Sequence, residues 1–210
     1  MRLKYLLLSI TMLINLGMGL SQSVEIYSGH KRAGVDLMWF KYFTNNKDER
    51  IPFLFFSRNR ANTDYQNTPT AFGSTNAVSY NLKSGLGIVA VGSLVNAGFT
   101  PKAGVQYFKM KGDFLFFGWL VADLKKEGNV DLFGMFRWQP KLNEQWRIFS
   151  QLELFPVYHP ASGFLSLTQR LRLGAKYRSW AAGFMADFNQ SGVDAFAQTY
   201  NAGGFLRHDF

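Results

Sequence analysis

The sequence predicts an all-β fold, a single antiparallel sheet closed into a transmembrane barrel, and three observations lead to this expectation. Apolar and polar residues alternate with a period of two through much of the second half of the chain. Aromatic residues make up 17% of the chain, yet the mean hydropathy is only −0.09, as expected where one face of each strand meets lipid and the other is polar. After the first twenty residues no stretch is apolar over the length of about 20 residues that a spanning helix needs.

The N-terminal residues have the order of a secretory signal. Arg2 and Lys4 form a short basic region, an uncharged and mostly apolar stretch follows, and Gly19 and Ser21 place small residues where a signal peptidase cuts. We therefore predict a signal peptide over residues 1–21 and one β-barrel domain over residues 22–210. The alternative, a transmembrane anchor, is disfavoured because the apolar stretch is short for a span.

Composition narrows the classes of partner. The chain contains no cysteine, which excludes disulfides, thiol catalysis and thiolate metal sites. The formal net charge of +9 becomes +7 when the two basic residues of the signal, Arg2 and Lys4, are removed. A basic balance is compatible with nucleic acid, anionic lipid or anionic solutes as partners. Because an exported protein rarely meets nucleic acid, we expect outer-membrane lipid and small solutes as partners.

Residues 164–177 show the alternation clearly. Leu171 and Leu173 fall on an apolar face, whereas Arg170, Arg172 and Lys176 fall on the opposite, basic face. The same two-sided pattern recurs in three neighbouring segments, residues 130–138, 146–155 and 180–189. A soluble antiparallel sandwich also alternates. The signal peptide, and charges that recur on the same face of successive strands, favour the barrel instead.

The first half of the chain leaves the number of strands open between ten and twelve. Four strands are expected there, at residues 34–43, 51–60, 85–95 and 104–110. Residues 61–84 form one long connection in the ten-strand solution, but connections of that length are uncommon. In the preferred twelve-strand solution, residues 22–29 and 76–83 are strands as well. Both counts are even, so both termini are expected in the periplasm.

Connections and aromatic residues indicate how the barrel sits in a membrane. Longer connections, expected to be external, fall at residues 96–103, 125–129, 157–163 and 189–198, joined in the twelve-strand solution by residues 61–75. Aromatic residues gather beside the short turns and predict a girdle at the other membrane surface. Its expected members are Phe114, Phe116, Trp138, Trp146, Tyr177, Trp180 and Phe210, joined in the twelve-strand solution by Tyr42, Phe43, Phe53 and Phe55.

The last residues carry a family resemblance. Gly204, Leu206, His208 and Phe210 alternate, and the chain as given ends on Phe210. This resembles the terminal-strand signal of bacterial outer-membrane β-barrel proteins, a resemblance that extends to the architecture of the mature chain. It implies localisation in the bacterial outer membrane, with Leu206, His208 and Phe210 read by the barrel assembly machinery. His208 departs from the aromatic residue often found there.

No catalytic, cofactor or metal residues are expected. His30, His159 and His208 lack the spacing of metal ligands. His159 and Ser162 fall in one loop, with Glu153 on the preceding strand, and a membrane-embedded hydrolase is one alternative. Their neighbours do not match the motif expected of such enzymes, so we interpret the segment as a surface turn and predict no enzymatic activity.

The inward-facing charges carry the functional prediction. In the last five strands the basic members outnumber the acidic ones by six to four: Arg137, Arg147, Arg170, Arg172, Lys176 and Arg207 against Asp131, Glu153, Asp187 and Asp209. Charged side chains lining a pore select ions. We therefore predict a narrow channel for small, anionic solutes. The alternative is a closed, non-conducting barrel with a structural role or a partner bound through its external loops. Solute identity and oligomeric state stay open.

Overall fold

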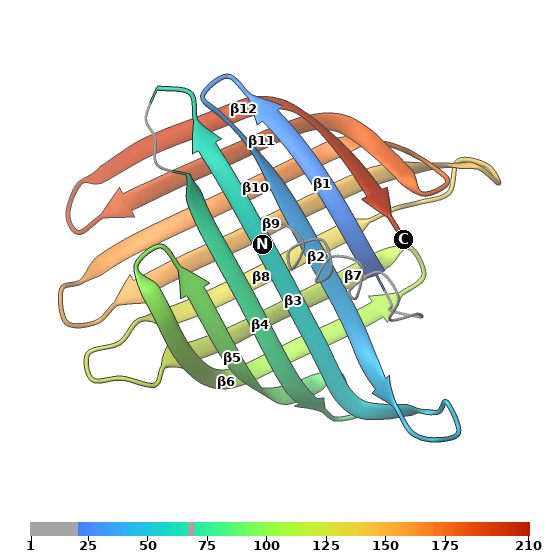
Figure 1. The fold of residues 1–210 in the computed structure, drawn as a ribbon, viewed down its shortest axis with the longest axis horizontal. Helices are drawn as coiled ribbons and strands as arrows, with labels where there is room; N and C mark the ends of the chain where they lie inside the picture. Colours follow the sequence, from blue (N-terminus) through green and yellow to red (C-terminus); the bar gives the residue numbers. More distant parts are fainter. Residues whose placement is uncertain (1–20, 67–69) are drawn as a thin grey trace, which may run out of the picture.

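The computed structural model describes residues 21–66 and 70–210, and these residues form one closed antiparallel barrel (Figure 1). Its strands are β1 (Ser21–Gly29), β2 (Arg32–Thr44), β3 (Arg50–Asp64), β4 (Ala71–Asn81), β5 (Leu86–Val95), β6 (Gly98–Lys111), β7 (Phe114–Asp123), β8 (Val130–Trp138), β9 (Trp146–His159), β10 (Phe164–Tyr177), β11 (Trp180–Gly192) and β12 (Phe196–Asp209). The twelve-strand solution is confirmed. None of the described residues forms a helix long and apolar enough to cross a membrane.

Pairing of the first and last strands closes the barrel. β1 pairs with β12 from Ser23↔Asp209 to Gly29↔Gly203, and the Phe210 amide donates to the Gln22 carbonyl oxygen at 2.9 Å. Closure leaves no sheet edge, which is what a strand structure requires inside a bilayer. In Figure 1 the front strands β1–β4 cross the rear strands β8–β11, as the strand tilt of a barrel requires. The predicted signal peptide lies outside the described residues except for Ser21, and it stays a prediction.

The predicted alternation of faces is seen in the exposure of the side chains. In β8, Asp131 and Arg137 are buried, while Leu132, Phe136 and Trp138 are exposed on the outer surface. Neighbouring strands repeat the arrangement, so the outside of the barrel carries an apolar belt, and the buried charged residues face inward. An inward arginine avoids the cost of about 2–4 kcal/mol that a lipid-facing one would incur at the bilayer midplane.

Several strands are longer than the sequence pattern predicted. β9 and β10 remain paired as far as His159↔Phe164, and β11 and β12 as far as Gly192↔Phe196. Most residues expected in long connections therefore belong to strands, and only short turns remain at residues 160–163 and 193–195. β9 has 14 residues, whereas about 9–11 suffice to span a bilayer. Its residues 156–159 extend the ladder with β10 past the end of the predicted strand.

The turns of the barrel lie at two opposite ends, the terminal end and the distal end. The terminal end carries Phe210 and the turns at residues 45–49, 82–85, 112–113, 139–145 and 178–179. The distal end is the opposite one, with the turns at residues 30–31, 96–97, 124–129, 160–163 and 193–195. The segments predicted to be external all reach the distal end.

Aromatic rings encircle the terminal end on the outer surface. Ring pairs join neighbouring strands there, with centroids 5.8 Å apart for Phe114 and Trp138 and 4.9 Å apart for Trp146 and Tyr177. The side chain of Phe53 likewise faces outward. These contacts form the girdle that the sequence predicted.

Tyr42 is a correction to the predicted girdle. Its side chain is only 9% exposed and packs inside the barrel, with its ring centroid 5.8 Å from that of Phe108. Its neighbour Phe43 is exposed on the outer surface. Adjacent strand residues point to opposite faces, so the two rings cannot both face lipid.

His208 takes the place of an aromatic residue in the terminal strand. Its ring lies 4.4 Å from that of Trp180 and 4.5 Å from that of Phe210, measured between centroids. The imidazole thus completes the row of outward rings, and Leu206 continues it toward the membrane interior.

Deleting Phe210 is expected to reduce the amount of barrel inserted in the outer membrane while export continues. The reason is that its ring is 68% exposed, contributes no interior packing, and by resemblance belongs to the assembly signal. Heat-modified gel mobility of outer-membrane fractions measures the folded barrel. Phe114→Ala is the matched control, since Phe114 is a girdle ring of similar exposure, 59%, outside the terminal strand. Equal yields from both variants would contradict the assigned signal.

Candidate functional site in the barrel interior

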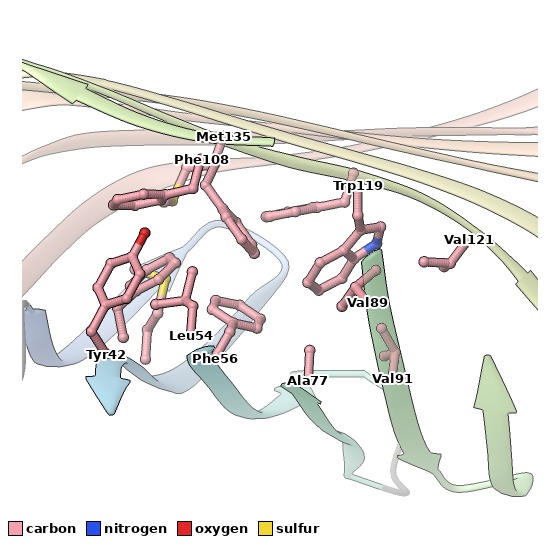
Figure 2. Packing of buried hydrophobic residues seen from close by; sticks show 14 residues of the cluster. Tyr42, Leu54, Phe56, Ala77, Val89, Val91, Phe108, Trp119, Val121 and Met135 are labelled. Carbon is pink, nitrogen blue, oxygen red and sulfur yellow. The ribbon is translucent and has the colours of Figure 1, made fainter. Parts of the chain in front are cut away.

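An aromatic cluster fills one side of the interior between β2–β5 and β6–β8 (Figure 2). The ring of Phe117 on β7 lies 5.0 Å from that of Phe40 on β2 and 4.9 Å from that of Phe56 on β3. β7 pairs only with β6 and β8, so these rings meet across the lumen. Figure 2 shows Leu54 and Phe56 on one wall reaching toward Trp119 on the other. The lumen is closed on this side by packing between opposite walls.

An ion-pair network fills the other side, and Arg58 on β3 is its centre. The Arg58 Nε atom donates to Asp36 on β2 at 3.0 Å, and its two terminal nitrogens donate to Glu153 on β9 at 2.9 and 3.0 Å. The three side chains are 11%, 6% and 3% exposed. β3 and β9 do not pair in the sheet, so the guanidinium bridges opposite walls of the barrel.

Arg172 makes a second bridge between strands that do not pair with each other, β10 and β1. It donates to Glu25 on β1 and to Asp187 on β11, both at 2.8 Å, and its side chain is 3% exposed. Nearer the terminal end, Asp209 accepts from both Arg207 and Lys176. Each carboxylate thus has a basic partner, as buried charges require.

All eight predicted lumen residues project to the interior. Two of them, Arg137 and Arg147, lie near the terminal end and outside the networks described above. Arg137 is buried and donates to Gln151 at 2.8 Å, while Arg147 is 36% exposed and lies 3.2 Å from Asp113. The other six take part in the networks just described: Glu153, Arg170, Arg172, Lys176, Asp187 and Arg207.

Sequence reasoning missed the charged residues of the first half of the chain. Glu25, Asp36, Arg58 and Arg60 all face inward and are at most partly exposed. In β3 both faces carry aromatic residues, which hides the two-sided pattern. The available signal was the spacing of Arg58 and Arg60, two residues apart, which equals that of the pair at positions 170 and 172.

Cavities open into the interior at both ends of the barrel. The distal cavity, of about 260 Å³, is lined by Arg58, Arg60 and Arg170 on one side and by aromatic residues on the other. The terminal cavity, of about 350 Å³, is lined by Arg137, Arg147 and Lys176 together with two acidic residues. Among the described residues no carboxylate lines the distal cavity. Side chains of the aromatic cluster and of the ion-pair network lie between the two cavities.

The Ser162 and His159 side chains do meet, but not in a catalytic arrangement. Ser162 Oγ lies 2.9 Å from His159 Nδ1 in the exposed turn between β9 and β10, and it also accepts from the Phe164 amide at 3.3 Å. Glu153, the acid considered as a third member, faces the lumen and is bound by Arg58 and Arg170. The pair therefore fits the turn-stabilising interpretation.

The fold of this chain is similar to those of solved bacterial barrels, whereas its sequence matches no known family. No protein-family model matches the chain, and no curated protein matches it. The KdgM porin in complex with disordered oligogalacturonate is 14% identical, with a TM-score of 0.48, covering 91% of this chain and 99% of that chain. The NanC porin is 12% identical, with a TM-score of 0.48, covering 88% and 98%. By its own strand pairing, outer belt and girdle, this chain is a twelve-stranded barrel of the bacterial outer-membrane type.

Proposed function

We propose that this barrel is a narrow outer-membrane channel for small, anionic solutes. The observation that supports the proposal is the excess of basic over acidic side chains at the two mouths. Three arginines line the distal cavity, and three basic and two acidic side chains line the terminal cavity. Basic groups at both entrances raise the local concentration of anions and lower that of cations. A solute crossing the barrel has to displace interior side chains, so conductance is expected to be small.

Conductance in planar bilayers tests the proposal. Under a salt gradient, the reversal potential of the wild-type barrel is expected to indicate anion preference. Arg147→Gln and Arg170→Gln, one at each mouth, are expected to shift it toward cations. Neither arginine carries the cross-lumen bridge, so folding is expected to persist, with heat-modified gel mobility as the check. Lys109→Gln is the control, because Lys109 lies on the outer face of β6 beside inward-facing Phe108.

A second candidate function is a closed barrel with a structural or partner-binding role. The packing of Phe40 and Phe56 against Phe117 across the lumen favours it, together with the Arg58–Glu153 bridge. A wild-type barrel that folds but never conducts would overturn the channel and leave this second function.

We further propose that the distal end faces the outside of the cell, since both termini of an even-stranded barrel lie in the periplasm. The chain has no cysteine, so single cysteines report position without background. Ala161→Cys in the distal turn is expected to react with a polymer-coupled maleimide on intact cells. Leu142→Cys, exposed in a terminal turn, should react only after the outer membrane is permeabilised. The reverse labelling would invert the orientation.

A further inference from the structure

Three arginines line the distal cavity, and among the described residues no carboxylate does. Arg58, Arg60 and Arg170 gather around only two carboxylates, those of Asp36 and Glu153. The Arg60 and Asp36 side chains are 10% and 6% exposed, and that of Glu153 is 3% exposed. Arg172 next to this cluster pairs with two carboxylates, Glu25 and Asp187, so the four arginines are balanced by four carboxylates. The local excess of guanidinium groups lies at the wall of the cavity.

The two carboxylates are already engaged by Arg58. Its guanidinium donates to both oxygens of Asp36 and to both oxygens of Glu153. Arg170 has only a long contact of 3.4 Å with Glu153. Arg60 Nε lies 3.1 Å from Asp36 without the geometry of a hydrogen bond, and this buried nitrogen has no hydrogen-bond partner. Arg60 and Arg170 thus keep donors for a further anion.

Aromatic rings form the other part of the cavity wall. The ring of Trp119 lies 5.1 Å from that of Phe133 and 5.3 Å from that of Phe56, and Phe155 continues the row beside Phe133. All four residues line the same cavity as the arginines. Aromatic rings beside guanidinium groups with free donors match a ligand that combines a ring with one carboxylate.

We propose that the distal cavity binds a small aromatic monocarboxylate, with the carboxylate between Arg60 and Arg170 and the ring against Trp119 and Phe133. The inference deepens the proposed function, because it names the solute class recognised at the distal mouth. The volume of about 260 Å³ suits one ring and its carboxylate and lies just below the range of about 300–1,000 Å³ for larger ligands. An acidic sugar shares the carboxylate but has no flat apolar face of comparable size.

Calorimetric titration of the purified, refolded barrel with benzoate, glucuronate and acetate tests the site. Benzoate is expected to bind most tightly, since only benzoate uses both parts of the wall. Arg60→Gln and Arg170→Gln are each expected to weaken benzoate binding by about tenfold or more, because each removes charge-assisted hydrogen bonds. Lys109→Gln, a basic residue on the outer surface, is expected to leave the affinity unchanged.

Fluorescence gives a second readout. Among the five tryptophans of the chain, Trp119 is the one that faces the lumen. Benzoate is expected to quench its emission in the wild-type barrel, and the quenching should disappear in Trp119→Phe, which keeps an aromatic ring at this position. Trp146→Phe, at the girdle, should retain the quenching.

The outcomes separate the site from the channel. Benzoate binding without conductance would support the site and overturn the channel. Anion-selective conductance without benzoate binding would support the channel and overturn the site. Tighter binding of glucuronate than of benzoate, or equal binding of all three anions, would also overturn the aromatic assignment.

Discussion

Replacing Arg58 with methionine is expected to lower the free energy of unfolding of the barrel by about 3–5 kcal/mol, the cost typical of breaking a buried ion pair from one side. Methionine fills a similar volume but donates no hydrogen bond. Asp36 and Glu153 would then remain buried, with only the weaker contacts to Arg60 and Arg170. The bridge between β3 and β9 would be lost at the same time.

Urea unfolding in detergent, followed by heat-modified gel mobility, measures this effect. Arg147→Met is the matched control, because Arg147 is partly exposed and its pair with Asp113 lies at the terminal mouth. A pair of that kind contributes about 0–1 kcal/mol. Equal losses in the two variants would show that Arg58 does not act as a buried cross-lumen bridge.

Phe117→Ala is expected to destabilise the barrel by about 3–5 kcal/mol, through the cavity left in a packed interior. Phe117 is fully buried, and its ring contacts those of Phe40, Phe56 and Trp119 from both walls. Inward-pointing neighbours on a closed sheet have little freedom to collapse into the space. The measurement is the urea midpoint under the same conditions as for the arginine variant.

Phe116→Ala provides the control for the aromatic cluster. Phe116 is the preceding residue in β7, and its ring contacts Phe136 and Tyr107 on the outer surface. Lipid or detergent tails can fill the space that its ring leaves, so its removal should cost clearly less than removal of Phe117. A larger loss for Phe116→Ala would contradict the assignment of faces in this strand.

The sequence alone was enough to predict which face of each later strand is inward. In residues 170–173 arginine and leucine alternate directly, so the basic face of β10 follows from strand geometry alone. It also favoured twelve strands, since residues 61–84 are too long for a plain connection. Both features are local, because they depend on neighbours in the chain.

Tertiary structure decided the strand ends and the direction of Tyr42. Beyond the lipid belt, water accepts polar and apolar side chains alike, so the end of an alternating pattern does not mark the end of a strand. In residues 42–43 two aromatic residues stand side by side, and only the register with β3, which shifts between Tyr42 and Thr44, determines which ring faces inward.

The distal cavity is also a product of tertiary structure. Arg58 and Glu153 are 95 positions apart in the chain, and Glu25 and Arg172 are 147 apart. The sequence determined that these side chains point inward. Which of them meet depends on how far the strands tilt and on which walls face each other when the sheet closes. Closure sets the distance between opposite walls, and therefore where the ion pairs bridge the lumen and where they leave space for a ligand.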